Sequence, residues 1–181
     1  FVTRKITKGV ARIYDSIRSV DSWRGRHGDA ARFDPIELGN LDSKRDWSDS
    51  EDFVEGVWLM LNQDNPKDYL LASGEAHSIR DFVEKAFETA GFGGHWEGEG
   101  VDEKYIDSGG RHKYLFVKVN PDFYRPAEVE ILLGDPKEAK EELGWKPKNS
   151  FDSLVRKMVE WDIEIEHNKR DAKRSTGARM G

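Results

Sequence analysis

Two arginines occupy positions where the neighbouring residues restrain them, and both have the chemistry to bind a phosphate. Arg45 lies in the stretch NLDSKRDW, just ahead of a helix-capping signal, and Arg125 precedes Pro126, which restricts the arginine backbone to an extended conformation. A planar guanidinium donates two parallel hydrogen bonds to a phosphate, which the point charge of a lysine cannot do. Glu128, three residues after Arg125, can accept a hydrogen bond from a ribose hydroxyl. These residue types fit a nucleotide-sugar site, although each arginine taken alone is more often a surface ion-pair partner.

The other motifs that could carry chemistry are weaker. Tyr114 and Lys118 have a spacing that brings a catalytic tyrosine and lysine together on a helix, but YLFVKV reads as a strand, where they lie about 13 Å apart. The stretch GFGGHWEGEG lacks the Gly-x-Gly-x-x-Gly order of a dinucleotide site and predicts a turn. The five histidines show no metal-ligand pairing, so no metal site is predicted.

The composition describes a strongly charged protein without cysteine chemistry. Among 181 residues, 36% are hydrophobic and 35% are charged, the net charge is -6 and the mean hydropathy is -0.78. The absence of cysteine excludes disulfides, thiolate metal sites and cysteine nucleophiles. No apolar stretch approaches the roughly 18 residues of a membrane helix, so no membrane partner is expected. The acidic balance argues against wholesale nucleic-acid binding.

The spacing of apolar residues predicts strands that alternate with helices, which is typical of an α/β fold. The sequence begins FVTRKITKGVARIY, with no methionine and with a helical pattern already running, so we expect it to be part of a longer protein. Trp58 is expected in the core. Further helices are predicted within 48–63, 77–91, 134–145 and 149–167, strands within 35–40, 68–73, 95–98 and 114–119, a loop insertion at 16–32, and a basic, disordered tail at 167–181.

Several stretches in this order resemble the C-terminal portion of the GDP-mannose 4,6-dehydratase family: FVTRKI, LGNLDSKRDW, GVWLML, ASGEAHSIRDFVEKAF, FYRPAEVEILLGDPKEAKEELGWKP and FDSLVRKMVEWDIE. The motif KRDW alone would indicate only nucleotide-sugar-modifying relatives, whereas TRKI, GNLD and LLGD followed by WKP narrow the resemblance to this family. It implies that residues 1–166 form the α/β C-terminal substrate-binding lobe of an extended short-chain dehydrogenase (Rossmann-type) enzyme, lacking the N-terminal dinucleotide-binding portion.

The resemblance also implies an activity for the complete enzyme. The family converts GDP-D-mannose to GDP-4-keto-6-deoxy-D-mannose and water, the first step toward GDP-L-fucose, with NADP as the cofactor. The catalytic residues and the NADP loop of the family belong to the N-terminal portion, so no catalytic and no cofactor-binding residue is expected in this chain. GDP-mannose is the implied partner, the full-length enzyme is expected to be a homo-oligomer, and the implied location is the cytoplasm.

The family pattern assigns roles to individual residues. By resemblance, Val2 and Lys5 lie near the guanosine, Arg45 contacts the nucleotide, and Arg125 with Glu128 takes the pyrophosphate and ribose side. Where KRDW is usually followed by Gly-His in the family, this chain has Ser-Asp at 48–49. That departure implies a differently capped helix and an additional negative charge near the site, with Trp47 as part of the site wall.

Two alternatives remain open at this point. The chain could be a non-catalytic module that binds a nucleotide sugar or docks on a complete subunit. It could also bind nucleic acid through the basic opening helix and the basic tail, which predicts a strongly salt-dependent affinity without preference for sugar nucleotides. The tail cations in question are Lys169, Arg170, Lys173 and Arg174.

Overall fold

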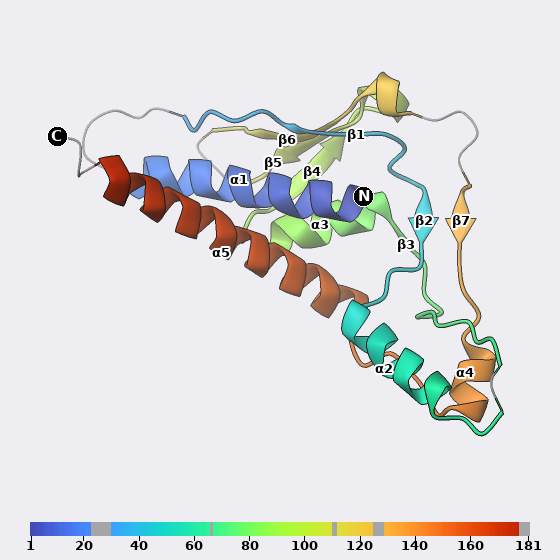
Figure 1. The fold of residues 1–181 in the computed structure, drawn as a ribbon. Helices are drawn as coiled ribbons and strands as arrows, with labels where there is room; N and C mark the ends of the chain where they lie inside the picture. The colour runs from blue at the N-terminus through green and yellow to red at the C-terminus, as the bar shows by residue number, and fades with distance from the viewer. Residues whose placement is uncertain (23–29, 66, 110–111, 125–128, 178–181) are drawn as a thin grey trace. The chain divides into compact units, whose positions relative to one another are not determined.

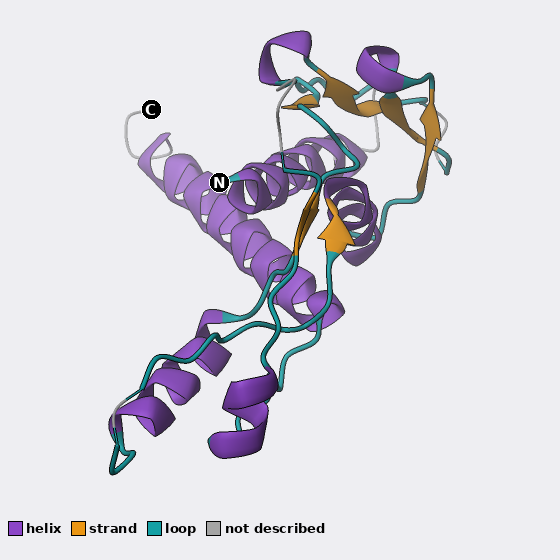
Figure 2. Cartoon of the chain, turned by 90° about the vertical axis from the view of Figure 1, so that its right-hand side faces the viewer, coloured by secondary structure: helices purple, strands orange, loops and turns teal. Residues whose placement is uncertain are grey.

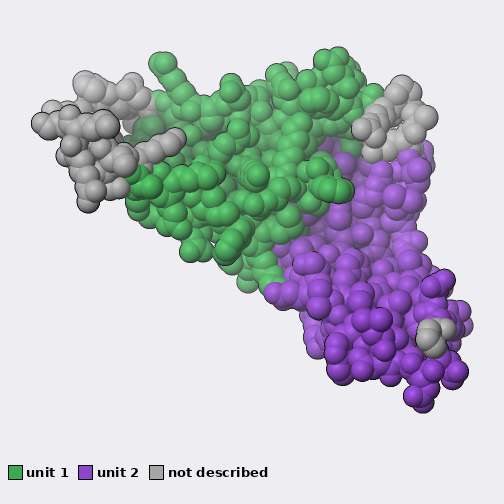
Figure 3. All heavy atoms as spheres, viewed as in Figure 1, with its two compact units in different colours: residues 1–40, 83–125, 155–181 green, residues 41–82, 126–154 purple. Residues whose placement is uncertain are grey.

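The computed structural model describes residues 1–22, 30–65, 67–109, 112–124 and 129–177, and they form an α/β fold, as the sequence predicts (Figure 1). The chain divides into two compact units, coloured separately in Figure 3. Unit 1 comprises residues 1–40, 83–125 and 155–181, and unit 2 comprises residues 41–82 and 126–154. In chain order, the elements are α1 (Val2–Ser22), β1 (Ile36–Leu38), β2 (Lys44–Arg45), α2 (Ser50–Leu61), β3 (His77–Ser78), α3 (Ile79–Thr89), β4 (Gly94–Glu97), η1 (Gly100–Asp102), β5 (Lys104–Asp107), β6 (Leu115–Val119), η2 (Pro121–Phe123), β7 (Ile131–Leu132), α4 (Lys137–Glu142) and α5 (Phe151–Gly177).

Helix α1 is amphipathic and is attached to α5 through a buried carboxylate in unit 1. Its apolar residues Ile6 and Val10 are fully buried, as their spacing of four predicts. On α5, Asp162 is 2% exposed and accepts hydrogen bonds from Arg4 Nη1 at 2.6 Å and from Thr7 Oγ1 at 2.7 Å. A charge buried this deeply needs such partners, because an unpaired carboxylate in the interior would be strongly destabilising. The contact therefore fixes the first turns of α1 on α5.

The sheet of unit 1 has one apolar face and one charged face. Its strand order is β1-β6-β5-β4, with β1 and β6 parallel and the other pairs antiparallel. Figure 2 shows helices on one face of this sheet. On that face Ile36 lies so close to Gly9 of α1 that a β-carbon on Gly9 would overlap its side chain. The opposite face carries a row of paired charged residues, one from each strand: Glu37, Lys118, Lys104 and Glu97.

Unit 2 contains a sheet of order β3-β2-β7 and a buried tryptophan that contacts α2. Trp145 is 2% exposed, and its indole N–H donates to the Asp52 carbonyl of α2 at 2.8 Å. Gly56 of α2 faces the Trp145 ring closely, so a β-carbon there would crowd both this ring and Leu71. The face of α2 that carries Gly56 is therefore the one that packs inside the unit.

The helix termini in unit 2 follow the signals in the sequence. Asp49 caps α2 by accepting a hydrogen bond from the Glu51 N–H at 3.0 Å. Ser78 and Asp81 form a reciprocal capping box, in which the Asp81 N–H donates to Ser78 Oγ at 3.0 Å and the Ser78 N–H donates to Asp81 Oδ2 at 2.8 Å. Gly144, which follows α4, has a φ of 65°, the left-handed conformation expected of a terminating glycine.

Several boundaries differ from the sequence-based expectation. Helix α1 continues to Ser22, so the first part of the expected loop at 16–32 is helical, while residues 23–29 lie outside the described part. Helix α5 continues to Gly177, past the start of the expected disordered tail at 167. One reason is a tertiary contact that periodicity does not encode, in which Arg170 donates to Asp15 of α1 at 2.6 Å. Residues 68–73, predicted as a buried strand, have no strand assignment.

The expectation that Trp58 lies in the core is wrong. Its side chain is 62% exposed, and Val54, Val57 and Leu61 on the same face of α2 are 69%, 48% and 78% exposed. We call these four residues the α2 stripe. Periodicity identifies which residues share a helix face, but it does not identify what covers that face.

No helix of the described residues is long and apolar enough to span a bilayer.

The buried carboxylate on α5 gives a direct test of this packing. Asp162→Ala leaves Arg4 and Thr7 without their acceptor, so we expect the free energy of unfolding to fall by about 2 to 3 kcal/mol. Glu164→Ala on the exposed side of the same helix should change it by less than about 0.5 kcal/mol. Urea denaturation followed by circular dichroism measures both values, and equal stabilities for the two variants would contradict the assigned role of Asp162.

Candidate functional site

The residues predicted to bind the nucleotide sugar fall into three groups. Val2 and Lys5 lie on the first turn of α1 in unit 1, and Arg45 lies on β2 in unit 2. Arg125 and Glu128 lie outside the described residues. The structure thus brings Val2 and Lys5 together, three residues apart on one helix face of unit 1. It places Arg45 in unit 2.

Lys5 lies against an aromatic ring that the sequence analysis did not single out. Its ammonium nitrogen is 4.0 Å from the centroid of the Phe123 ring, within the range of a cation–π contact. Phe123 ends the short helix η2, two residues before Arg125 in the stretch FYRPAE. Proximity to that motif is the only sequence signal that could have indicated Phe123.

The turn that carries Phe123 is attached to the end of β1. The Asn120 N–H donates to the Leu38 carbonyl at 2.8 Å, and the Asn120 side chain donates to Glu37 at 3.0 Å. Asn120 also caps η2 by accepting from the Asp122 N–H at 2.9 Å. Hydrogen bonds from Lys118 and then from Asn120 lower the pKa of Glu37, and the positive charge of Lys5 contributes in the same direction. Glu37 is therefore ionised at neutral pH.

Arg45 is oriented by backbone carbonyls. Its Nη1 donates to the carbonyls of Lys44 and Val129, both at 2.8 Å. Its strand is fixed on one side by parallel pairing with β7 and on the other by antiparallel pairing with β3. The guanidinium direction is thus set by main-chain geometry, which an adjacent lysine with a flexible stem could not reproduce.

Asp46, immediately after Arg45, joins three segments of unit 2. Its carboxylate accepts hydrogen bonds from the Ser73 hydroxyl at 2.6 Å and from the N–H groups of Ser73, Gly74 and Gly134 at 2.9, 2.9 and 3.4 Å. Burial acts to raise the pKa of Asp46, but these hydrogen bonds outweigh it and lower the pKa below its ordinary value. The sequence analysis missed this residue, because its donors come from positions distant in the chain.

Trp47 and Asp49 have internal contacts in unit 2. The Trp47 ring packs against Phe82 and Phe151 at centroid distances of 5.2 and 6.0 Å. His77 stacks flat on Phe151, with ring centroids 3.8 Å apart. Asp49, expected to add negative charge near the site, is 6% exposed and directs its carboxylate at the N-terminus of α2. Its charge is thereby balanced by the helix dipole.

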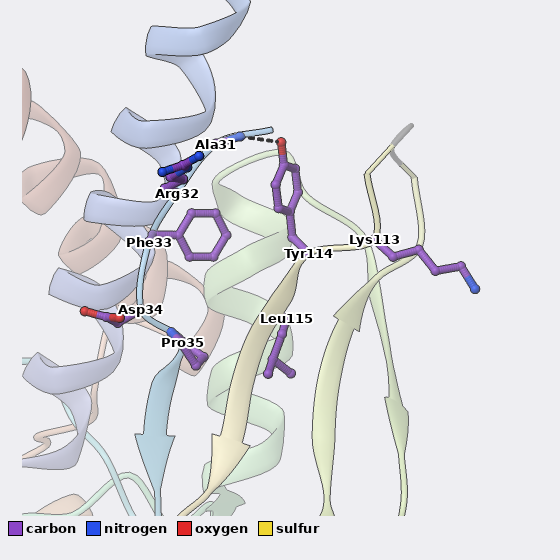
Figure 4. Close-up of a pocket in the computed structure, with 8 residues that line it drawn as sticks. All are labelled: Ala31, Arg32, Phe33, Asp34, Pro35, Lys113, Tyr114 and Leu115. Atoms are coloured by element: carbon purple, nitrogen blue, oxygen red, sulfur yellow. Dashed lines mark hydrogen bonds between the residues drawn. The ribbon is translucent and has the colours of Figure 1, made fainter. Parts of the chain in front are cut away.

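A separate hollow of about 510 Å³ in unit 1 contains none of the predicted site residues. It is open to solvent, and Figure 4 shows the Phe33 and Tyr114 rings beside each other, with Lys113 extending away from them. Tyr114 accepts a hydrogen bond from the Ala31 N–H at 3.0 Å, and Lys118 belongs to strand β6. As predicted, Tyr114 and Lys118 therefore do not lie on a helix. The lining residues are Ala31, Arg32, Phe33, Asp34, Pro35, Lys113, Tyr114 and Leu115.

The glycine-rich stretch does not form a dinucleotide-binding loop. The glycine-rich stretch at 91–94 connects α3 to β4, the reverse of the strand-turn-helix order that a dinucleotide fold uses. Gly91 has a φ of 80° and closes the helix, which confirms the predicted turn. No cluster of three or more His, Asp or Glu side chains with the geometry of a metal site occurs among the described residues.

Sequence comparison identifies close relatives along most of the chain. The family model described as GDP-mannose 4,6 dehydratase matches residues 1–158. GDP-mannose 4,6 dehydratase of Drosophila melanogaster is 44% identical over 165 residues, which is 91% of this chain and 38% of the relative. The Homo sapiens protein of the same name is 43% identical over 167 residues, covering 91% of this chain and 40% of the relative. The chain thus spans about two fifths of the length of these curated relatives.

Solved structures with low sequence identity share the fold. RMD from Pseudomonas aeruginosa, complexed with NADPH, has a TM-score of 0.64 at 18% identity and covers 91% of this chain and 43% of that chain. UDP-glucose 4-epimerase from Bifidobacterium longum, in complex with NAD+ and UDP, has a TM-score of 0.59 at 16% identity. The match covers 91% of this chain and 39% of that chain.

Asp46 can be tested through stability and its pH dependence. An amide cannot accept all the hydrogen bonds that the carboxylate accepts, so Asp46→Asn should lower the free energy of unfolding at pH 7 by about 1 to 2 kcal/mol. Because the folded-state pKa is depressed, the carboxylate stabilises the fold above its unfolded-state pKa of about 4 and loses this effect as the pH falls through the folded-state pKa.

The stability gap between the wild type and Asp46→Asn should therefore narrow as the pH is lowered below about 4. Urea denaturation at several pH values measures this gap, and Asp68→Asn, an exposed aspartate of the same unit, is the matched control. A gap that stays constant from pH 7 to pH 3 would contradict the role of the ionised carboxylate.

Proposed function

Because this chain belongs to the GDP-mannose 4,6-dehydratase family, we propose that it supplies the nucleotide-sugar-binding part of an enzyme that converts GDP-D-mannose to GDP-4-keto-6-deoxy-D-mannose and water. The observation that carries the proposal is the family match over residues 1–158, together with the identity of 44% to a relative of that name. In the proposed scheme, residues 1–166 are the substrate-binding portion of a hydro-lyase.

The proposed contacts assign one task to each residue. Val2 and Lys5 serve the guanosine side, Arg45 serves the nucleotide, and Arg125 with Glu128 serves the pyrophosphate and ribose. Two observations support this division. The ammonium of Lys5 is held on an aromatic ring, and Arg45 is oriented by two main-chain carbonyls. Both arrangements reduce the conformational entropy that a flexible cation loses when it binds the nucleotide.

We assign the catalytic groups and the dinucleotide to the part of the relatives' length that this chain does not span. The glycine-rich stretch of this chain is not a dinucleotide loop, whereas RMD and UDP-glucose 4-epimerase, which share the fold, are solved with NADPH and NAD+. We therefore propose that a nicotinamide cofactor, NADP in particular, is held outside this chain. This chain alone should therefore bind substrate without converting it. The cytoplasm and a homo-oligomeric full-length enzyme complete the proposal.

The exposed α2 stripe supports the proposal that a further portion of polypeptide covers this face of unit 2. The four residues of the stripe are roughly half or more exposed, which is unusual for a contiguous apolar helix face. Leu70 is 57% exposed, although its neighbour Leu71 packs toward Gly56. Residues 67–73 have no strand assignment. The occupant we propose is the portion of the dehydratase subunit that accounts for the unspanned three fifths of the relatives' length.

The nucleic-acid alternative has less support. Its basic surface depends on cations of the opening helix and of the tail, yet Arg4 bonds Asp162, Arg170 bonds Asp15 and Lys169 bonds Glu166. Cations already paired with carboxylates contribute less to the field that attracts a polyanion.

Calorimetric titration of the purified chain tests substrate binding. We expect GDP-mannose to bind more tightly than UDP-glucose, and Arg45→Ala to weaken binding by about 10-fold or more, because a charge-assisted hydrogen bond to phosphate is lost. Arg125→Ala should have a similar effect. Lys44→Ala, the neighbouring exposed cation, is the matched control and should change the affinity less. Equal affinities for both sugar nucleotides, or equal losses for Lys44→Ala and Arg45→Ala, would contradict the assignment.

Complementation tests the proposed partner of unit 2. The chain is mixed with the remaining portion of the Drosophila melanogaster relative, and the formation of the keto sugar is measured. Trp58→Glu should reduce the activity at least 10-fold by placing a charge in an apolar interface. Trp161→Glu on α5, where the tryptophan is 59% exposed, is the matched control and should leave the activity unchanged. The reverse ranking of the two variants would refute the role of the α2 stripe.

A further inference from the structure

We propose that Phe123 is a positioning residue, whose ring holds the ammonium of Lys5 where the guanosine of the nucleotide sugar binds. The inference rests on the proposed function, because it concerns the same ligand. It adds a residue that the resemblance to the family does not assign, and it states how that residue acts.

The contact between Lys5 and Phe123 does not serve the hydrophobic core. Phe123 is 46% exposed and Lys5 is exposed, so the contact lies at the surface of unit 1. Among the described residues, no carboxylate lies within ion-pair distance of Lys5. Glu37 is near enough to feel its charge, but Glu37 bonds Lys118 at 2.8 Å and Asn120 at 3.0 Å. The ring is therefore the group that holds the ammonium.

The ring itself is fixed by the backbone beneath it. Asn120 bonds the last residue of β1 and caps η2, so the position of the turn follows from the position of the strand. Gly39, which follows β1, lies directly against the Phe123 carbonyl, and a β-carbon at position 39 would overlap that oxygen. Only a glycine permits this close approach, so the end of β1 and the turn that presents Phe123 form one rigid support.

A ring suits this task better than a carboxylate would. A cation–π contact does not neutralise the ammonium and leaves the N–H donors that point away from the ring available, whereas an ion pair would compete with the anionic ligand. The long lysine stem otherwise loses rotamer freedom when it binds. Holding the ammonium beforehand removes part of that loss, and a contact of this kind at an exposed site corresponds to a change in affinity of about two- to fivefold.

A double-mutant cycle measured by titration with GDP tests the inference. We expect Phe123→Leu to weaken GDP binding by about three- to fivefold, and Phe123→Tyr, which retains the ring, to stay within about twofold of the wild type. Lys5→Ala should weaken binding by about 10-fold. In the Lys5→Ala background, Phe123→Leu should cause no further loss, because the ring then has no ammonium to hold. Tyr124→Leu, an adjacent exposed aromatic, is the matched control.

Each outcome separates this inference from the proposed function. If the wild type does not bind GDP, the proposed function fails and the inference fails with it. If Phe123→Leu binds as the wild type does, or weakens binding equally in both backgrounds, the inference is refuted while the proposed function stands. Thermal denaturation verifies that each variant is folded, and Phe123→Met replaces Phe123→Leu in the cycle if the leucine variant is unfolded.

Discussion

The ionised carboxylate of Asp46 connects the segments of unit 2 that meet beside Arg45. It accepts hydrogen bonds from Ser73, Gly74 and Gly134 and so joins segments that are far apart in the sequence. The same residue follows Arg45, so the network that lowers the pKa of Asp46 also fixes the strand that presents the guanidinium. Structure and proposed function are therefore linked through one side chain, which must stay charged to accept every donor.

Unit 1 supports its site by the same principle with different groups. Buried Asp162 holds the first turns of α1, and the end of β1 holds the turn that carries Phe123. Lys5 lies between these two supports. In both units, neutral groups contact a cation that the proposal assigns to the ligand: the Phe123 ring contacts Lys5, and the carbonyls of Lys44 and Val129 accept hydrogen bonds from Arg45.

The sequence predicted the elements whose signals are local. The helices predicted within 77–91 and 134–145 are confirmed as α3 and α4, and short-range features mark their ends: the capping box of Ser78 and Asp81 and the terminating Gly144. It did not predict Asp46 or Phe123, because their partners depend on tertiary contacts between distant segments. The exposure of Trp58 was missed for a related reason, since a helix pattern does not specify which surface covers its apolar face. Of the predicted site, Val2, Lys5 and Arg45 are described, and their roles remain predictions.

The central claim is that this chain binds a guanine nucleotide sugar through Lys5 and Arg45. The most direct measurement is a titration of the isotopically labelled chain with GDP-mannose, followed by the NMR shifts of assigned backbone amides. The account predicts saturating shifts at and beside Lys5, Phe123 and Arg45. Shifts confined to the hollow beside Tyr114, or no shifts at saturating concentrations of ligand, would contradict it.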